Sequence, residues 1–222
     1  MKKLIKSYAF YFKNRDFLYS FLISFVMLAV ALFINFYAGL YATDHASNSV
    51  TDIILSNIST YDVDGIFIYG AFAFWIFFIC LCSLYPHKIP FTAKTLSLFI
   101  VIRSIFISLT HLGPFPSQIV ISATSIISKF SFGADLFFSG HTGIPFLFAL
   151  IFWDTPRLRW AFIATSIMFG IVVLLGHLHY SIDVLSAFFI TYTIFHLAEL
   201  FFKKDRIIFH SGIPPASILE TK

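Results

Sequence analysis

The feature that most constrains how this chain can fold is a series of apolar runs, several of them about as long as a membrane span. A transmembrane helix needs about 20 mainly apolar residues. Hydrophobic residues make up 59% of the chain and charged residues only 12%, whereas soluble domains carry about 25% charged residues. We therefore predict an all-α integral membrane protein, folded as a six-span transmembrane helical bundle. The expected spans cover about 17–40, 66–85, 91–112, 136–153, 160–176 and 182–202.

Lysine and arginine predict the orientation of this bundle. If the N-terminus lies inside, all 15 of them except Arg103 and Lys129 fall on one side of the membrane. Because loops rich in Lys and Arg stay in the cytoplasm, we expect both termini there. The regions would be a basic N-terminus at 1–16, a membrane domain at 17–202 and a cytoplasmic tail at 203–222. We expect a multi-pass protein of a bacterial inner membrane or a eukaryotic endomembrane, with no nucleic-acid partner.

Two loops are expected on the opposite, exoplasmic side. Residues 43–64 contain aspartates but no Lys or Arg, and residues 113–135 are polar overall. Within the second loop, 119–127 is apolar enough to lie in the membrane interface but too short and too polar to span it. The acidic residues of the first loop are Asp44, Asp52, Asp62 and Asp64.

Two polar clusters, at 133–142 and 177–183, enclose the expected fourth and fifth spans. Two crossings return the chain to the face where it started, so both clusters should meet at the exoplasmic membrane surface. His179 and Asp183 stand four residues apart and would share one helical face if a helix begins there. A histidine held by a carboxylate and facing a second histidine, His141, indicates a nucleophile and acid pair.

Arg103 and the pair of His179 and Asp183 each allow a structural interpretation beside the catalytic one. Arg103 within a span costs about 2.5–3.5 kcal/mol on insertion scales, so its charge must be compensated. It could pair with Asp135 for structural reasons or act as a fixed cation for phosphate, and we favour the second. His179 and Asp183 could be a cap pair at a helix start, since Asp favours such ends. We favour a catalytic role for them.

Other residues near the clusters carry weaker signals. Ser139 precedes Gly140 and His141 without a hydrolase-type turn around it, so we do not expect a nucleophilic serine. His177 is expected only to line the site. The pair of His177 and His179 lacks an obvious third and fourth ligand, so we expect neither a metal nor another cofactor.

These residues resemble the motifs of a known family. Ser139-Gly140-His141-Thr142 followed by His179-x-x-x-Asp183 is similar to the second and third motifs of the phosphatidic acid phosphatase (type 2) superfamily. Within it, the sphingomyelin synthase branch is the closer match. That branch has a run that begins Gly-Asp and ends Ser-Gly-His-Thr. Residues 135–142 match this run, but Ala134 stands at the place of its glycine. It also has a His-x-His-Tyr-Thr-x-Asp-Val run, which residues 177–184 match with Ser for Thr. The resemblance covers the chain from about Arg103 to the last span, within an expected core at about 91–202.

The chain also departs from the phosphatases of that superfamily. Their first motif is Lys-x6-Arg-Pro, whereas Leu96 and Ser104 stand at the Lys and Pro places around Arg103. Their third motif has Ser-Arg at the places of Val172 and Val173. Two phosphate-binding cations are therefore missing. This counts against an ordinary phosphomonoesterase and favours the synthase-like branch.

The resemblance implies a two-step reaction and a set of roles. His179 would attack the phosphorus of a phospholipid with Asp183 supporting it, and His141 would act as general acid and then base. The partners would be a phospholipid together with a lipid alcohol (ceramide or diacylglycerol-like) or water. The alternatives are a lipid phosphate phosphatase and a non-catalytic lipid transport protein. The remaining residues of the expected site are Arg103, Ser139 and Gly140 for phosphate binding, and Asp135, His177 and Tyr180 as lining.

Overall fold

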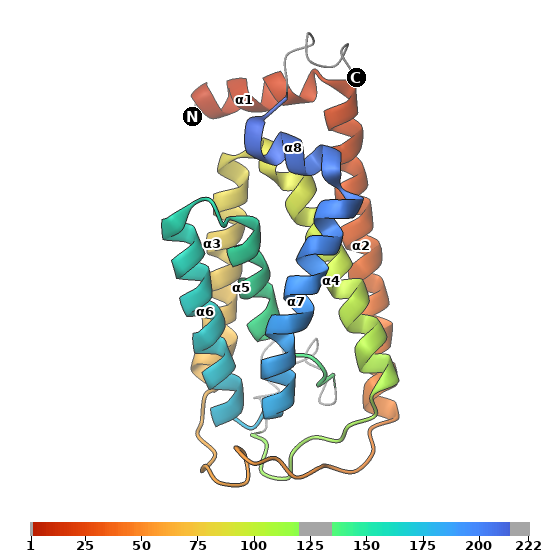
Figure 1. Cartoon of the computed structure of the whole chain (residues 1–222), viewed down its shortest axis with the longest axis vertical. Helices are drawn as coiled ribbons and strands as arrows, with labels where there is room; N and C mark the ends of the chain where they lie inside the picture. Colours follow the sequence, from red (N-terminus) through yellow and green to blue (C-terminus); the bar gives the residue numbers. More distant parts are fainter. Residues whose placement is uncertain (1, 120–134, 214–222) are drawn as a thin grey trace.

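The computed structural model describes residues 2–119 and 135–213, and all regular structure within these ranges is helical (Figure 1). This confirms the all-α prediction. In chain order the elements are α1 (Lys2–Phe12), α2 (Arg15–Asp44), the π-helical turn η1 (Ile66–Gly70), α3 (Ala71–Leu84), the 3₁₀ turn η2 (Pro86–Lys88), α4 (Ile89–Leu109), α5 (Gly140–Ile151), α6 (Pro156–Leu175), α7 (Ser181–Phe201) and α8 (Lys203–Ser211).

Five helical segments of the described chain are long and apolar enough to cross a membrane. They correspond to the first, second, third, fifth and sixth predicted spans. The bounds of these segments are Arg15–Asp44, Ile66–Leu84, Pro86–Leu109, Pro156–Leu175 and Ser181–Phe201.

The predicted fourth span, 136–153, is only partly helical. Its helix, α5, has 12 residues, which is about 18 Å of helix against a hydrocarbon core of roughly 30 Å. The chain from 135 to 139 is irregular, and α5 begins part-way along α4 and α7 (Figure 1). The described residues therefore support five candidate spans, and the sixth remains a prediction. The apolar composition of 136–153 did not reveal that its first residues are held outside a helix.

Helix α5 packs against α4, α6 and α7, and a glycine allows its close approach to α4 and α7. A Cβ atom on Gly143 would lie 2.8 Å from the Phe99 ring and 2.9 Å from Thr191 Oγ1. On another face, Phe148 of α5 stacks on Phe78 of α3 with ring centroids 3.6 Å apart. Close packing of this kind is felt when even one methyl group is added. It fixes the start of α5 against the two helices that carry the other site residues.

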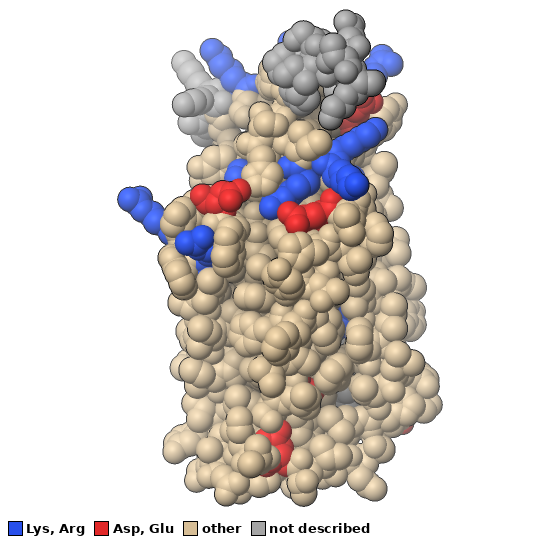
Figure 2. Space-filling view, viewed as in Figure 1, with Lys and Arg blue, Asp and Glu red and all other residues tan. Residues whose placement is uncertain are grey.

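Two helices that the sequence analysis did not predict, α1 and α8, lie across one end of the bundle (Figure 1). A buried ion pair holds α8 in place, with Lys94 Nζ of α4 2.6 Å from Asp205 Oδ2 and 2.7 Å from Ser20 Oγ. Figure 2 shows Lys and Arg side chains gathered at this end of the molecule. The opposite end carries the connections after α2, α4 and α6.

Candidate active site

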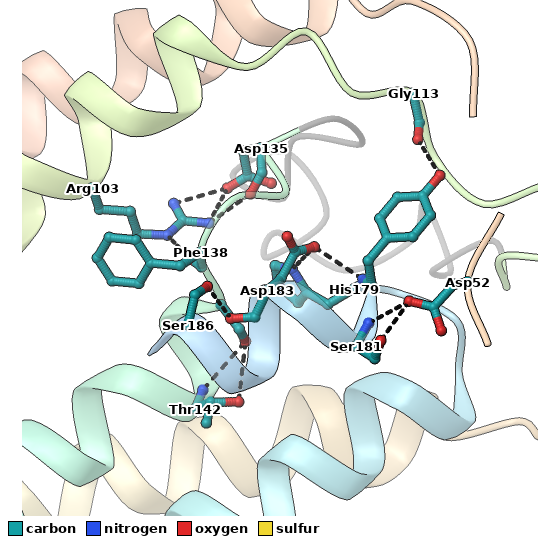
Figure 3. A network of polar contacts seen from close by, with 12 residues as sticks. Asp52, Arg103, Gly113, Asp135, Phe138, Thr142, His179, Ser181, Asp183 and Ser186 are labelled. Carbon is teal, nitrogen blue, oxygen red and sulfur yellow. Dashed lines mark hydrogen bonds and ion pairs between the residues drawn. The ribbon is translucent and has the colours of Figure 1, made fainter. Parts of the chain in front are cut away.

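The predicted site residues come from three places in the fold that lie close together (Figure 3). Arg103 is on α4, Ser139 and His141 are at the start of α5, and His179 and Asp183 are at the start of α7. The backbone N–H of Ser139 donates to the carbonyl oxygen of Asp183 over 3.1 Å. The two polar clusters therefore meet, as the two intervening crossings predicted.

The geometry of His179 and Asp183 differs from the predicted shared helical face. Helix α7 begins at Ser181, so His179 precedes the helix and Asp183 is its third residue. Asp183 Oδ2 accepts a hydrogen bond from the Tyr180 backbone N–H at 2.9 Å, which is one half of a capping box. The cap interpretation is thus correct for Asp183. The same oxygen lies 3.4 Å from His179 Nδ1, so the histidine and carboxylate still face each other.

This pair is buried and incompletely hydrogen-bonded. Asp183 is 0% exposed and His179 7% exposed. Asp183 Oδ1 and His179 Nδ1 have no hydrogen-bond partner among the described residues. Buried polar atoms without partners are rare because they cost free energy, and they call for a functional explanation. Catalytic hydrogen bonds are often long in the absence of substrate, which fits the 3.4 Å separation.

The start of α5 is shaped by Ser139 and Gly140. The fully buried Ser139 hydroxyl caps the helix and accepts from the Thr142 N–H at 3.4 Å and from Thr142 Oγ1 at 3.2 Å. The Ser139 side chain thus serves as the N-cap of α5. A Cβ atom on Gly140 would lie 3.4 Å from Arg103 Nε, so the guanidinium rests against the first turn of α5. First-turn N–H groups and a guanidinium together suit an anion.

His141 lies in the first turn of α5 with its ring between two aromatic side chains. The Phe67 ring centroid is 4.2 Å away and that of Phe169 is 5.8 Å away. The neighbouring residues place His141 beside the other predicted groups: Gly140 lies against Arg103, and the Ser139 N–H binds the carbonyl oxygen of Asp183. The second histidine is thus in the segment that meets the start of α7.

Arg103 is buried, and its charge is compensated by the chain before α5. Its Nη1 and Nη2 atoms lie 3.3 Å from Asp135 Oδ2, and Nη2 donates to the Asp135 carbonyl oxygen at 2.6 Å. Its Nε donates to the carbonyl oxygen of Phe138 at 2.8 Å. The ion pair considered as the structural alternative is therefore present. Arg103 thereby binds the backbone of the irregular stretch before α5, which accounts for residues 135–139 not being helical.

Two predicted lining residues, His177 and Tyr180, contact the connections that follow α2 and α4. His177 Nδ1 lies 2.6 Å from Ser117 Oγ, and the residue adopts a left-handed φ of 53° at the reversal between α6 and α7. The Tyr180 hydroxyl donates to the Gly113 carbonyl oxygen at 2.8 Å and accepts from the Val50 N–H at 3.2 Å. Both side chains fasten the turn that carries His179. No group of three or more His, Cys, Asp or Glu in the described ranges is arranged to hold a metal ion.

Sequence reasoning missed Asp52, which also reaches the start of α7. Asp52 Oδ2 accepts hydrogen bonds from the Ser181 N–H and from Ser181 Oγ, both at 2.7 Å. Burial raises the pKa of Asp52, but hydrogen bonds from Ser181, Leu55 and Ile54 outweigh this and leave the pKa below its ordinary value. The contact joins residues 129 positions apart, so no local spacing could have indicated it.

Comparison with known families supports the resemblance at its coarser level. A family model described as PAP2 superfamily C-terminal matches residues 133–200, from just before α5 to near the end of α7. The match supports membership of the phosphatidic acid phosphatase type 2 superfamily and, with it, a lipid phosphatase or phosphotransferase type of function. Searches of curated proteins and of solved structures found no match to the chain.

Proposed function

We propose that this protein is a membrane-embedded phosphotransferase or phospholipase C-like enzyme that acts on phosphodiester lipids and resembles the sphingomyelin synthase branch. The observation that carries the proposal is the meeting of the α5 and α7 starts, joined by the bond from Ser139 N–H to the Asp183 carbonyl oxygen. It brings His179 and its carboxylate near Arg103 (Figure 3), and it places the turn of α5 that carries His141 beside them.

In the first step His179 is the nucleophile. Its Nδ1 faces Asp183, so a proton held there leaves the lone pair of Nε2 free to attack phosphorus. A nitrogen–phosphorus bond forms while the bond from phosphorus to the diacylglycerol oxygen breaks. His141 gives its proton to that oxygen, and the Asp183 carboxylate stabilises the positive charge on His179.

In the second step the acceptor takes the phosphorylated headgroup. His141, now unprotonated, removes the proton from the acceptor hydroxyl, whose oxygen attacks phosphorus. The nitrogen–phosphorus bond breaks and His179 is restored. A lipid alcohol as acceptor gives headgroup transfer, and water gives hydrolysis.

Charge at the site favours a diester over a monoester. Among the described residues Arg103 is the cation of the cluster, and a bound phosphate would replace the Asp135 carboxylate beside it. Leu96 and Val173 stand at the places where the phosphatases have further cations, and both are buried in the apolar core. A phosphodiester brings one negative charge, which Arg103 can balance, whereas a monoester brings close to two.

The proposed site faces the exoplasmic or luminal side. The Lys and Arg side chains gather at the opposite end, near α1 and α8 (Figure 2). Under the positive-inside rule that end, with α1 and α8, is cytoplasmic.

The test supplies purified protein separately with phosphatidic acid and with a choline or ethanolamine phospholipid, and measures phosphate, phosphorylated headgroup and diacylglycerol. We expect turnover of a diester lipid and slow turnover of phosphatidic acid. His179→Ala should abolish the reaction. His196→Ala, a matched change at an exposed residue of α7, should not.

Fast release of phosphate from phosphatidic acid with the diester untouched would establish the alternative, a lipid phosphate phosphatase. Identical lipid profiles for wild type and His179→Ala in cells that lack such enzymes would support a non-catalytic transport protein.

A further inference from the structure

The connection after α2 is fastened to the start of α7 by one carboxylate. Asp52 Oδ2 accepts from both Ser181 N–H and Ser181 Oγ at 2.7 Å. Its other oxygen accepts from the backbone N–H groups of Ile54 at 2.8 Å and Leu55 at 3.1 Å. Asp52 is itself buried, at 7% exposure. Its two oxygens thus join the outer connection to the first residue of a helix far along the chain (Figure 3).

The contact with Asp52 provides a hydrogen-bond acceptor for the N–H group of Ser181, the first residue of α7. The first N–H groups of a helix lack intrahelical acceptors, and a negative charge near them is favourable. Asp183 provides a carboxylate from within the first turn, where it binds the Tyr180 N–H. Asp52 provides the second from a distant part of the chain.

The residues around His179 are consequently held from several directions. Ser181, two positions later, is bound by Asp52. Tyr180 between them is held through its hydroxyl by Gly113 and Val50. His177, two positions earlier, contacts Ser117. Val50 and Asp52 belong to the same connection, so release of Asp52 would loosen two of these attachments.

We propose that Asp52 is a positioning residue that sets the orientation of His179 by anchoring the start of α7. The inference rests on the proposed function, since it takes His179 as the nucleophile. Asp52 binds Ser181 rather than the reacting groups, so it acts through the backbone that carries His179. A displacement of about 1 Å in a reacting group can cost on the order of 10²-fold in rate, even when the mutated residue lies outside the reacting groups.

The test compares Asp52→Asn with Asp62→Asn, a matched change in the same connection. Asp62 accepts from the Asp64 N–H, and that contact lies within its own loop. We expect Asp52→Asn to lower kcat for a diester lipid by about 10²-fold with KM nearly unchanged. Asp62→Asn should leave both constants near wild type. Ser181→Ala, which removes only the hydroxyl contact, should lower kcat less than Asp52→Asn does.

Hydrogen exchange of the peptide spanning 177–186 gives a readout that needs no turnover. Exchange should become faster in Asp52→Asn and stay at the wild-type rate in Asp62→Asn. Wild-type kcat in a folded Asp52→Asn variant would overturn the proposal, and so would an equal loss of kcat in Asp62→Asn. If Asp52→Asn fails to fold, a wild-type kcat in Ser181→Ala would overturn it. If the wild type and His179→Ala are equally inactive on every lipid, the proposed function fails and the catalytic role of Asp52 fails with it. Faster exchange in Asp52→Asn would then still identify the anchor as structural.

Discussion

Asp183 combines a structural and a chemical role in one carboxylate. Its Oδ2 atom accepts from the Tyr180 N–H and also faces His179 Nδ1, while its Oδ1 atom has no hydrogen-bond partner among the described residues. A carboxylate that supports a histidine nucleophile must supply negative charge, whereas a helix cap needs only an acceptor oxygen. The two roles can therefore be separated by substitution.

Asp183→Asn should keep the cap but lose the charge. The amide oxygen can still accept from the Tyr180 N–H, so we expect the melting temperature to change little. Activity should fall by about 10⁴-fold, since the histidine loses the carboxylate that fixes its tautomer and stabilises its charged form. Asp183→Ala should lose the cap as well, at about 1 kcal/mol of stability. Thermal unfolding and turnover of both variants check this, and near-normal turnover by Asp183→Asn would contradict it.

At the scale of elements, the turn between α6 and α7 depends on a residue in an unusual conformation. His177 has a φ of 53°, in the left-handed region where Asn, Asp and His are enriched among residues other than glycine. Its imidazole is buried against Thr60, in the connection after α2, and Ser117, in the connection after α4. Burial lowers the pKa of His177 below its ordinary value of 6.5, although the Asp52 carboxylate opposes this effect.

The lowered pKa predicts how stability depends on pH. Between the folded and unfolded pKa values of His177, the unfolded state binds more protons than the folded state. The free energy of unfolding therefore falls as the pH decreases below about 6.5. His177→Asn keeps a residue suited to the left-handed conformation but removes the titrating group. We expect its melting temperature to decline less than that of the wild type between pH 7 and pH 5. Parallel declines in the two proteins would show that His177 does not contribute.

Elements that depend on apolar composition could be predicted from the sequence, and the starts of α5 and α7 could not. The long helices follow from runs of about 20 apolar residues, with ends near the predicted positions. The late start of α5 depends on Arg103 binding the backbone of Asp135 and Phe138. The position of His179 just before α7 depends on the cap at Asp183. Both are tertiary or capping interactions that hydropathy does not record.

At the scale of the whole molecule, the two motifs lie together because α5 leads the chain away from the cluster and α6 brings it back (Figure 1). The reversal between two helices was predicted from the apolar runs, although α5 has only 12 residues. The anchor from Asp52 to Ser181 could not be anticipated in this way. Likewise, α1 and α8 lie across the bundle end and are too short to appear as apolar runs. Polar contacts between distant residues and the short helices α1 and α8 thus became evident only from the structure.

The proposed mechanism requires that His179 form a covalent bond to phosphorus. The direct measurement incubates the protein with a diester lipid whose headgroup carries an isotopic label, stops the reaction in alkaline denaturant, and locates the label by mass spectrometry of the peptides. We expect the phosphorylated headgroup on His179 in the wild type, more of it when lipid acceptor is withheld, and none in His179→Ala. Turnover of the diester with no label on His179, or with the label on another side chain such as that of Ser139, would contradict the account.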